Sequence, residues 1–204
     1  MNETIDSTTS ISDTESICEL IHAWAYHRDR CNWEKLKDTF WPKGTISLSW
    51  FDGPFQQFVD SSREMADTGA QSKHIVAHPF IKINGHRAVS EANVTLHVRG
   101  GKGPIETDLT AYARFYDLLE KREGVWRILK RTAIYEKDRM DSVKPSLMFW
   151  IAHFFINLKK YPKAFRFSGF ALEKAGLELK RNLIQDNSEE LKLLYKEGDD
   201  WLSG

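Results

Sequence analysis

Four segments in the middle of the chain alternate between apolar and polar residues with a period of two. Side chains of a β-strand point alternately to opposite faces, so each segment predicts a long strand. The dipeptides Asn84-Gly85, Gly100-Gly101 and Glu123-Gly124 separate consecutive segments, and each suits a hairpin turn. The predicted strands are His74–Asn84, Ala88–Arg99, Ile105–Glu120 and Val125–Glu136. An antiparallel meander of this kind requires other elements to cover at least one face of its sheet.

The residues before the meander predict helices that can provide this cover. Ser12-Asp-Thr-Glu15 has the pattern of a capping box, and apolar residues at helical spacing follow it as far as Cys31-Asn32. A short helix is expected at 33–40, a strand at 45–50 and an amphipathic helix at 55–67. Helices followed by an antiparallel meander indicate an α+β fold with helices packed on one sheet face.

The two ends of the chain differ from this middle part. Residues 1–11 are small and polar, which predicts a disordered arm, and residues 12–140 form the predicted α+β domain. Residues 141–204 predict a helical extension that begins with the apolar run Leu147–Ile156. That run is about half of the roughly twenty residues that a bilayer span needs. We expect it to be buried against the body or another subunit, with an interfacial membrane contact as the alternative.

Composition excludes some partners and indicates others. Lys plus Arg and Asp plus Glu both total 29, so no basic surplus is present for nucleic acid. Seven Trp and twelve Phe supply rings for a core or for a pocket that holds a flat apolar ligand. Cys18 and Cys31 are too far apart on one predicted helix to form a disulfide. Reduced thiols and the polar, acidic N-terminal sequence predict a cytoplasmic protein without a signal peptide.

Asp29 and His74 are the first candidates for chemistry. Asp29 shares a helical row with Cys18 and Ala25 beside the apolar stripe, where a carboxyl group is suited to proton transfer. Its alternative role is to cap the turn that follows the helix. Histidine shuttles protons near neutral pH and a carboxylate can orient it, although His74 alone fits a half-buried strand residue equally well.

Other candidates also keep two interpretations. Tyr112 either donates a hydrogen bond to a substrate oxygen or lies in the core. Arg131 either anchors an acidic group or forms an ion pair on the surface. His74 and His78 are four residues apart on a strand, which does not bring them together as metal ligands. The sequence contains no GxGxxG, Walker or HExxH pattern, so no cofactor and no metal are expected.

The order of four motifs resembles the SnoaL-like branch of the nuclear transport factor 2-like superfamily. They are Tyr26-His-Arg-Asp29-Arg-Cys-Asn-Trp33-Glu-Lys-Leu36, Phe40-Trp-Pro-Lys-Gly44, Lys73-His74 and Glu123-Gly-Val-Trp126-Arg-Ile-Leu-Lys-Arg131. The resemblance covers roughly residues 12–138 and implies a cone-shaped, cystatin-like roll. In that fold a bent sheet is wrapped by helices around a pocket.

The resemblance also implies a catalytic pair. In family members such as scytalone dehydratase and bile-acid 7α-dehydratase, an Asp four residues before a Trp pairs with a His at the start of a strand. Asp29 stands four residues before Trp33, and His74 opens the predicted strand. In this interpretation Asp29 and His74 are catalytic. The expected substrate-binding residues are Tyr26, Trp50, Tyr112 and Arg131.

The function expected from these residues and this resemblance is a dehydratase-like lyase or isomerase that needs no cofactor. An Asp-His pair would act as general acid and base on a small, apolar or polycyclic molecule. The alternative is a non-catalytic protein of the same fold that binds a small molecule or serves as an accessory oligomerisation subunit. A homo-oligomer, either a dimer or a trimer, is expected in both cases.

Overall fold

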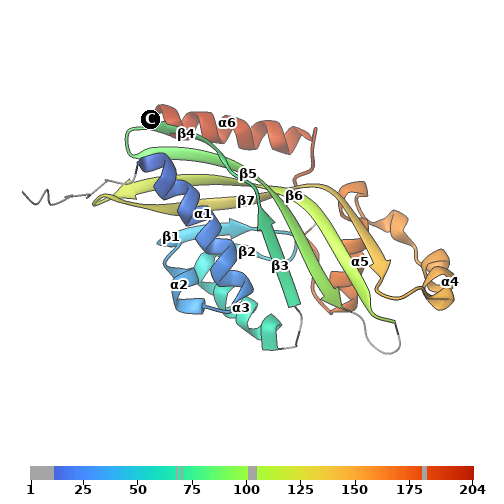
Figure 1. The fold of residues 1–204 in the computed structure, drawn as a ribbon. Coiled ribbons are helices and arrows are strands. Elements are labelled where there is room, and N and C mark those ends of the chain that lie inside the picture. Colours follow the sequence, from blue (N-terminus) through green and yellow to red (C-terminus); the bar gives the residue numbers. More distant parts are fainter. Residues whose placement is uncertain (1–11, 68, 70, 101–104, 181–182) are drawn as a thin grey trace, which may run out of the picture.

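The computed structural model describes residues 12–67, 69, 71–100, 105–180 and 183–204 (Figure 1). Its centre is an open, curved sheet of seven strands in the order β2-β1-β7-β6-β5-β3, with β4 also paired to β5. The strands are β1 (Phe40–Ser47), β2 (Asp52–Pro54), β3 (Gln71–Val76), β4 (Phe80–Asn84), β5 (Arg87–Gly100), β6 (Thr107–Arg122) and β7 (Val125–Ser142). The predicted α+β class, with a curved sheet and a helical C-terminal extension, is confirmed; the sheet is antiparallel except between β1 and β7, which pair in the parallel direction.

The meander runs from β4 to β7, and two of its predicted turns are present. Gly85 has a φ of 58°, and Glu123 and Gly124 have φ values of 50° and 81°. These left-handed conformations match the twist of the strands that they join. The third predicted turn includes Gly101, which lies outside the described residues.

The predicted strand His74–Asn84 is two strands in the structure. Both pair with β5 in the antiparallel direction, β3 through Val76 opposite Val94 and β4 through Phe80 opposite Glu91. Pro79 lies between them, and a proline has no N–H to contribute to a strand ladder. The sequence prediction of one continuous strand was therefore wrong at this proline.

The helices α1 (Asp13–Asp29) and α3 (Phe55–Asp67) pack on one face of the sheet, which we call the inner face, and α2 (Trp33–Lys37) packs against both helices (Figure 1). The predicted capping box begins α1: the Glu15 N–H donates to Ser12 Oγ at 3.2 Å, and the Ser12 N–H donates to Glu15 Oε2 at 2.9 Å. The inner core includes Ile21, Trp24, Phe58, Val94 and Phe115.

The start of β1 and the position of Trp50 differ from the sequence prediction. Phe40 was expected at the end of a helix but begins β1, because it pairs with Ile128 of β7. Trp50 was expected in a strand and lies in a bend after β1. Long-range pairing with β7 determines where β1 begins, whereas β1 ends at its short connection to β2, in which Ser47 lies opposite Asp52.

The opposite, outer face of the sheet is covered by α6 (Glu189–Ser203), which lies along the sheet in Figure 1. Ser188 caps this helix by accepting the Leu191 N–H at 3.1 Å. A second apolar cluster fills the space between helix and sheet. Its buried members are Val89, Tyr116, Leu118, Ile134, Leu191 and Leu194.

Between β7 and α6 the chain forms α4 (Leu147–Phe155), two 3₁₀ turns (Leu158–Lys160 and Lys163–Phe165) and α5 (Arg166–Lys174). Of the two positions expected for the Leu147–Ile156 run, burial against the body was wrong, and burial against another subunit stays a prediction. Phe149 is buried, but most of the large apolar side chains of α4 are exposed. No helix within the described part of the chain is long and apolar enough to cross a membrane. The predicted N-terminal arm, residues 1–11, lies outside the described residues.

Candidate functional site

Asp29 and His74 meet on the inner face, at the junction of α1 and β3. His74 Nδ1 lies 2.6 Å from Asp29 Oδ1, and the His74 backbone N–H donates to Asp29 Oδ2 at 2.7 Å. The side chain of His74 is 11% exposed and that of Asp29 is 5% exposed. A carboxylate is not favoured by the dipole at a helix C-terminus, so the contact with His74 explains its position better than helix capping does.

This geometry determines which nitrogen of His74 is available for chemistry. An ionised carboxylate only accepts hydrogen bonds, so Nδ1 is the protonated nitrogen of the neutral ring and Nε2 carries the free lone pair. The pKa of His74 lies below its ordinary value, first because burial disfavours the charged ring and also because Arg28 and Arg131 repel it. Asp29 acts in the opposite direction. The imidazole is therefore neutral at pH 7 and able to accept a proton.

Aromatic rings and a buried ion pair surround His74. The Trp24 ring lies edge-on to it, with centroids 5.3 Å apart. The guanidinium of Arg131 lies 4.5 Å from the centroid of Trp24 and 4.4 Å from that of Phe115. Arg131 donates to both oxygens of Asp117, each at 2.7 Å, and both side chains are almost completely buried. The predicted surface pairing of Arg131 was wrong, because its acidic partner lies with it in the core.

Two donors near His74 have no hydrogen-bond partner within the described part of the chain. They are Trp24 Nε1 and Arg131 Nη1, and both are buried. A buried donor without a partner has lost its hydration without compensation, and such groups are rare in folded proteins. Both donors would be satisfied by an acceptor atom of a bound molecule.

The structure brings only some of the predicted substrate-binding residues towards the pair. Trp50 belongs to the same aromatic cluster, since its ring is 5.4 Å from Phe58, which in turn is 6.3 Å from Trp24. Tyr26 is exposed and lies beneath the guanidinium of Arg30, away from the core. Tyr112 belongs to the outer face, with Lys137 beside its ring, because strand alternation places it opposite the core residues Ala111 and Ala113.

His78 lies apart from this site. Its Nε2 is 3.6 Å from Cys18 Sγ, and its Nδ1 is 3.1 Å from the carbonyl oxygen of Pro79. Among the described residues, no cluster of three or more His, Cys, Asp or Glu side chains has the arrangement of a metal site. Cys18 and Cys31 are both free thiols.

A second candidate site is a cavity of about 200 Å³ on the outer face, between β4 and α6. Its lining residues are Phe80, Lys82, Val89, Glu91, Tyr116, Tyr195, Asp199 and Leu202. Burial, together with the charges of Asp199 and Glu91, raises the pKa of Tyr116 to about 12. This phenol therefore remains protonated at neutral pH and is unsuited to act as a base.

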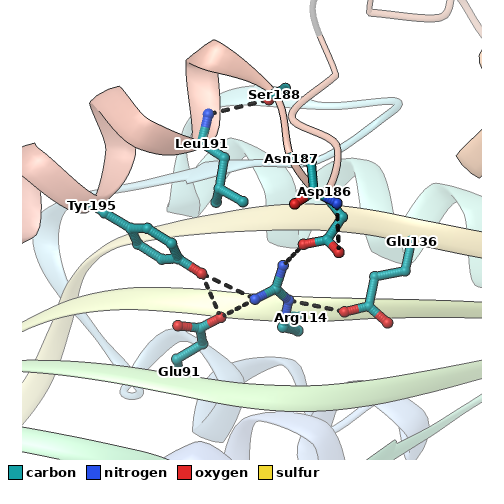
Figure 2. A network of polar contacts seen from close by, with 8 residues as sticks. All are labelled: Glu91, Arg114, Glu136, Asp186, Asn187, Ser188, Leu191 and Tyr195. Atoms are coloured by element: carbon teal, nitrogen blue, oxygen red, sulfur yellow. Dashed lines mark hydrogen bonds and ion pairs between the residues drawn. The ribbon is translucent and has the colours of Figure 1, made fainter.

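Beside this cavity, Arg114 is the centre of a polar network (Figure 2). Its guanidinium contacts Glu91 at 2.7 Å, Glu136 at 2.9 Å and the Tyr195 hydroxyl at 2.9 Å, and it also pairs with Asp186. Tyr195 Oη in turn donates to Glu91 at 3.0 Å. The network joins β5, β6 and β7 to α6 and the segment before it, so we interpret Arg114 as a structural residue.

Sequence reasoning missed Trp24, Asp117 and Arg28 at the inner site. Asp117 stands next to the apolar pair Leu118-Leu119, and an acid in such a surrounding was the available signal. Trp24 was recognised only as part of the apolar stripe of the first helix. Arg28 is buried and lies over the ring of Trp33 at 5.7 Å, which no local pattern indicated.

Several solved structures share this fold. LinA aligns with a TM-score of 0.51 and 18% identity over 65% of this chain and 88% of its own. A type 2 hexachlorocyclohexane dehydrochlorinase (LinA) aligns with a TM-score of 0.50 and 12% identity over 64% of this chain and 88% of its own. A candidate scytalone dehydratase from Novosphingobium aromaticivorans aligns with a TM-score of 0.50 and 16% identity over 64% of this chain and 87% of its own. At these identities the likeness concerns the fold.

Two fungal proteins resemble the chain over most of its length. Pea pathogenicity protein 2 of Fusarium vanettenii is 30% identical over 91% of this chain and 84% of its own. A PEP2-like protein of the same fungus is 29% identical over 91% of this chain and 84% of its own. Since 91% of the chain is covered, the similarity includes most of the C-terminal extension. Residues 9–132 match the family model of the SnoaL-like domain, so the chain belongs to the SnoaL-like family of the nuclear transport factor 2-like fold.

Proposed function

We propose that this protein is a cofactor-independent lyase or isomerase of the dehydratase type. Its general base is His74, oriented by Asp29. The observation that carries the proposal is the buried contact of 2.6 Å between His74 Nδ1 and Asp29 Oδ1. A lowered pKa supports the same role, because it keeps Nε2 unprotonated at neutral pH.

In the proposed reaction, His74 Nε2 accepts a proton from a carbon atom of the substrate, and Asp29 stabilises the resulting imidazolium. For a dehydration, the same proton passes to the hydroxyl group that leaves as water, while the electron pair of the C–H bond forms the new double bond. For an isomerisation, the proton returns to a different carbon. Both reactions conserve the proton within the site and need no oxidant or metal.

The two unpartnered donors suggest how charge in the substrate would be stabilised. Removing a proton beside a carbonyl group places negative charge on its oxygen. Arg131 Nη1 and Trp24 Nε1 are buried donors near His74, and preorganised donors in a site without water stabilise such an oxygen strongly. The aromatic surroundings, including Trp50 and Phe58, suit a largely apolar substrate.

The proposal is tested with small aromatic and polycyclic β-hydroxy ketones in deuterium oxide. Proton NMR follows the loss of water and the incorporation of deuterium at carbon. We expect turnover by the natural sequence and a loss of about 10²–10⁴-fold in His74→Ala. His97→Ala is the matched control, because His97 is an exposed histidine whose ring contacts Thr110 on β6. Full turnover by a folded His74→Ala protein contradicts the proposal.

The alternative function is binding without catalysis, and the outer-face cavity favours it. That cavity lies across the sheet from His74 and is lined by Tyr116 and Tyr195. A ketone that binds without reacting, and whose affinity falls in Tyr195→Ala but not in His74→Ala, would support this alternative.

A further inference from the structure

Helix α4 presents an unusual surface for a protein of balanced charge. Its exposed apolar side chains are between 52% and 86% exposed. They are Leu147, Met148, Trp150, Ile151, Phe154 and Phe155. Figure 1 shows α4 at the edge of the molecule, beyond the ends of β6 and β7. Contiguous exposed apolar surface of this kind marks an interaction site rather than ordinary surface.

The charges around α4 indicate what this surface meets. Between Val143 and Leu172 the chain has no Asp or Glu, although acids and bases balance over the whole sequence. The basic residues of this segment are Lys144, Lys159, Lys160, Lys163 and Arg166. Lys160 pairs with Glu173 at 2.7 Å, whereas Lys144, Lys159 and Lys163 have no ion-pair partner among the described residues.

We propose that α4 and the lysines beside it form a peripheral docking site for an anionic lipid bilayer. Rings such as Trp150 and Phe154 would enter the interface between headgroups and acyl chains, while Lys159 and Lys163 would contact the negatively charged headgroups. The helix has nine residues and is about 14 Å long, less than half of the hydrocarbon thickness of a bilayer. It therefore lies on the membrane and does not span it.

The same charges disfavour the main competing occupant, a second copy of this chain. A symmetric contact through α4 would bring together two copies of a segment that carries lysines and no acidic residue, and like charges facing each other oppose association. An anionic bilayer gives each of these lysines a favourable interaction. Phe149 is buried, whereas the other large apolar side chains of α4 are exposed in the protein alone, so the apolar face is already presented before a membrane is met.

The test measures binding of the full chain to vesicles by flotation. Vesicles of phosphatidylcholine alone are compared with vesicles in which about one third of the lipid is phosphatidylserine. We expect binding to the anionic vesicles to be at least about tenfold stronger and to weaken in about 0.5 M NaCl. The double variant Trp150→Glu/Phe154→Glu should lose binding to both kinds of vesicle. The double variant Lys159→Glu/Lys163→Glu should lose the preference for vesicles that contain phosphatidylserine.

Matched controls use the same substitutions elsewhere. Leu193→Glu changes an exposed apolar residue of α6, and Lys43→Glu/Lys73→Glu reverses two exposed lysines of β1 and β3; both should bind as the natural sequence does. Circular dichroism verifies that each variant is folded. Absence of binding, or equal binding to both vesicles, overturns the proposal. A dimer that Trp150→Glu/Phe154→Glu converts to a monomer, without vesicle binding, assigns the surface to a second copy instead.

Discussion

His74 is held by Asp29 at two points, its ring nitrogen and its backbone N–H. The backbone contact ties β3, which runs from Gln71 to Val76, to the end of α1. The ring contact then selects the tautomer. One carboxylate therefore positions the strand and orients the base, and a substitution at residue 29 should affect both.

This arrangement predicts a particular pH dependence. Burial lowers the pKa of His74 below 6.5, and Asp29 raises it. Turnover, measured as kcat/KM, should be constant near neutral pH and fall as the pH decreases through that lowered pKa, because protonated His74 cannot accept a proton. Asp29→Asn should reduce the plateau and move the acidic limb to still lower pH. A limb that moves to higher pH would show that Asp29 does not interact with the titrating group.

The pair Arg131–Asp117 predicts a large effect on stability. Arg131→Met leaves the carboxylate of Asp117 buried, with the Ser90 hydroxyl at 3.4 Å as its one remaining side-chain hydrogen-bond partner among the residues that the structure describes. We expect a decrease of about 3–5 kcal/mol in the free energy of unfolding, measured by urea denaturation. The double variant Arg131→Met/Asp117→Leu should recover most of the lost free energy of unfolding, since apolar residues can replace a buried ion pair with little loss of stability. A double variant as unstable as the single one contradicts this account.

Among the helices, α6 depends on one glycine for its position. A Cβ atom at Gly198 would lie 1.9 Å from Tyr116 Oη and 2.8 Å from its Cζ. Alanine normally stabilises a helix by up to about 1 kcal/mol relative to glycine, but this overlap costs about 1–3 kcal/mol. Gly198→Ala should therefore lower the urea midpoint. Adding Tyr116→Phe should restore part of the loss, and a stabilised Gly198→Ala protein would show that α6 moves freely over the sheet.

Local signals in the sequence explain why most elements were predictable. The capping box at Ser12 and the turn at Glu123-Gly124 depend on neighbouring residues, and both are present. The boundary of β1 at Phe40 was not predictable, because its pairing with Ile128 comes from a distant segment. The break at Pro79 was readable from the sequence but was overlooked.

The candidate site was predictable to a similar degree. The spacing of Asp29 from Trp33 and the place of His74 indicated the pair through a family resemblance. Asp117 and Trp24 were missed, because their place beside Arg131 depends on which strands and helices face each other. Tyr112 was expected at the site because the sequence does not show which sheet face carries the helices α1–α3.

On the scale of the whole molecule, the C-terminal extension is part of both cores. Phe165 and Leu183 pack in the inner core, and Leu191 and Leu194 complete the outer cluster. Lys180 also joins the extension to β1 and β2, through Ser47 Oγ at 2.7 Å and Asp52 at 2.6 Å. The domain and its extension therefore form one structural unit.

This unity predicts that the SnoaL-like part is not stable alone. A chain that ends at Ser142 would expose Val89, Tyr116, Leu118 and Ile134 to water. We expect it to aggregate or to unfold at a much lower temperature than the full chain, as measured by size-exclusion chromatography and thermal denaturation. A monomeric truncated protein with an unchanged Tm would contradict this expectation.

The parallel pairing of β1 with β7 also has a consequence for biosynthesis. Thr45 and Ile46 form their ladder with Lys130 and Arg131, which the ribosome adds much later. Until then the edge of β1 that β7 will cover has no partner, and an unpaired strand edge favours aggregation. The strand β1 therefore has no partner on this edge until β7 has been synthesised, and slow translation of the residues between them lengthens the time during which the nascent chain can aggregate.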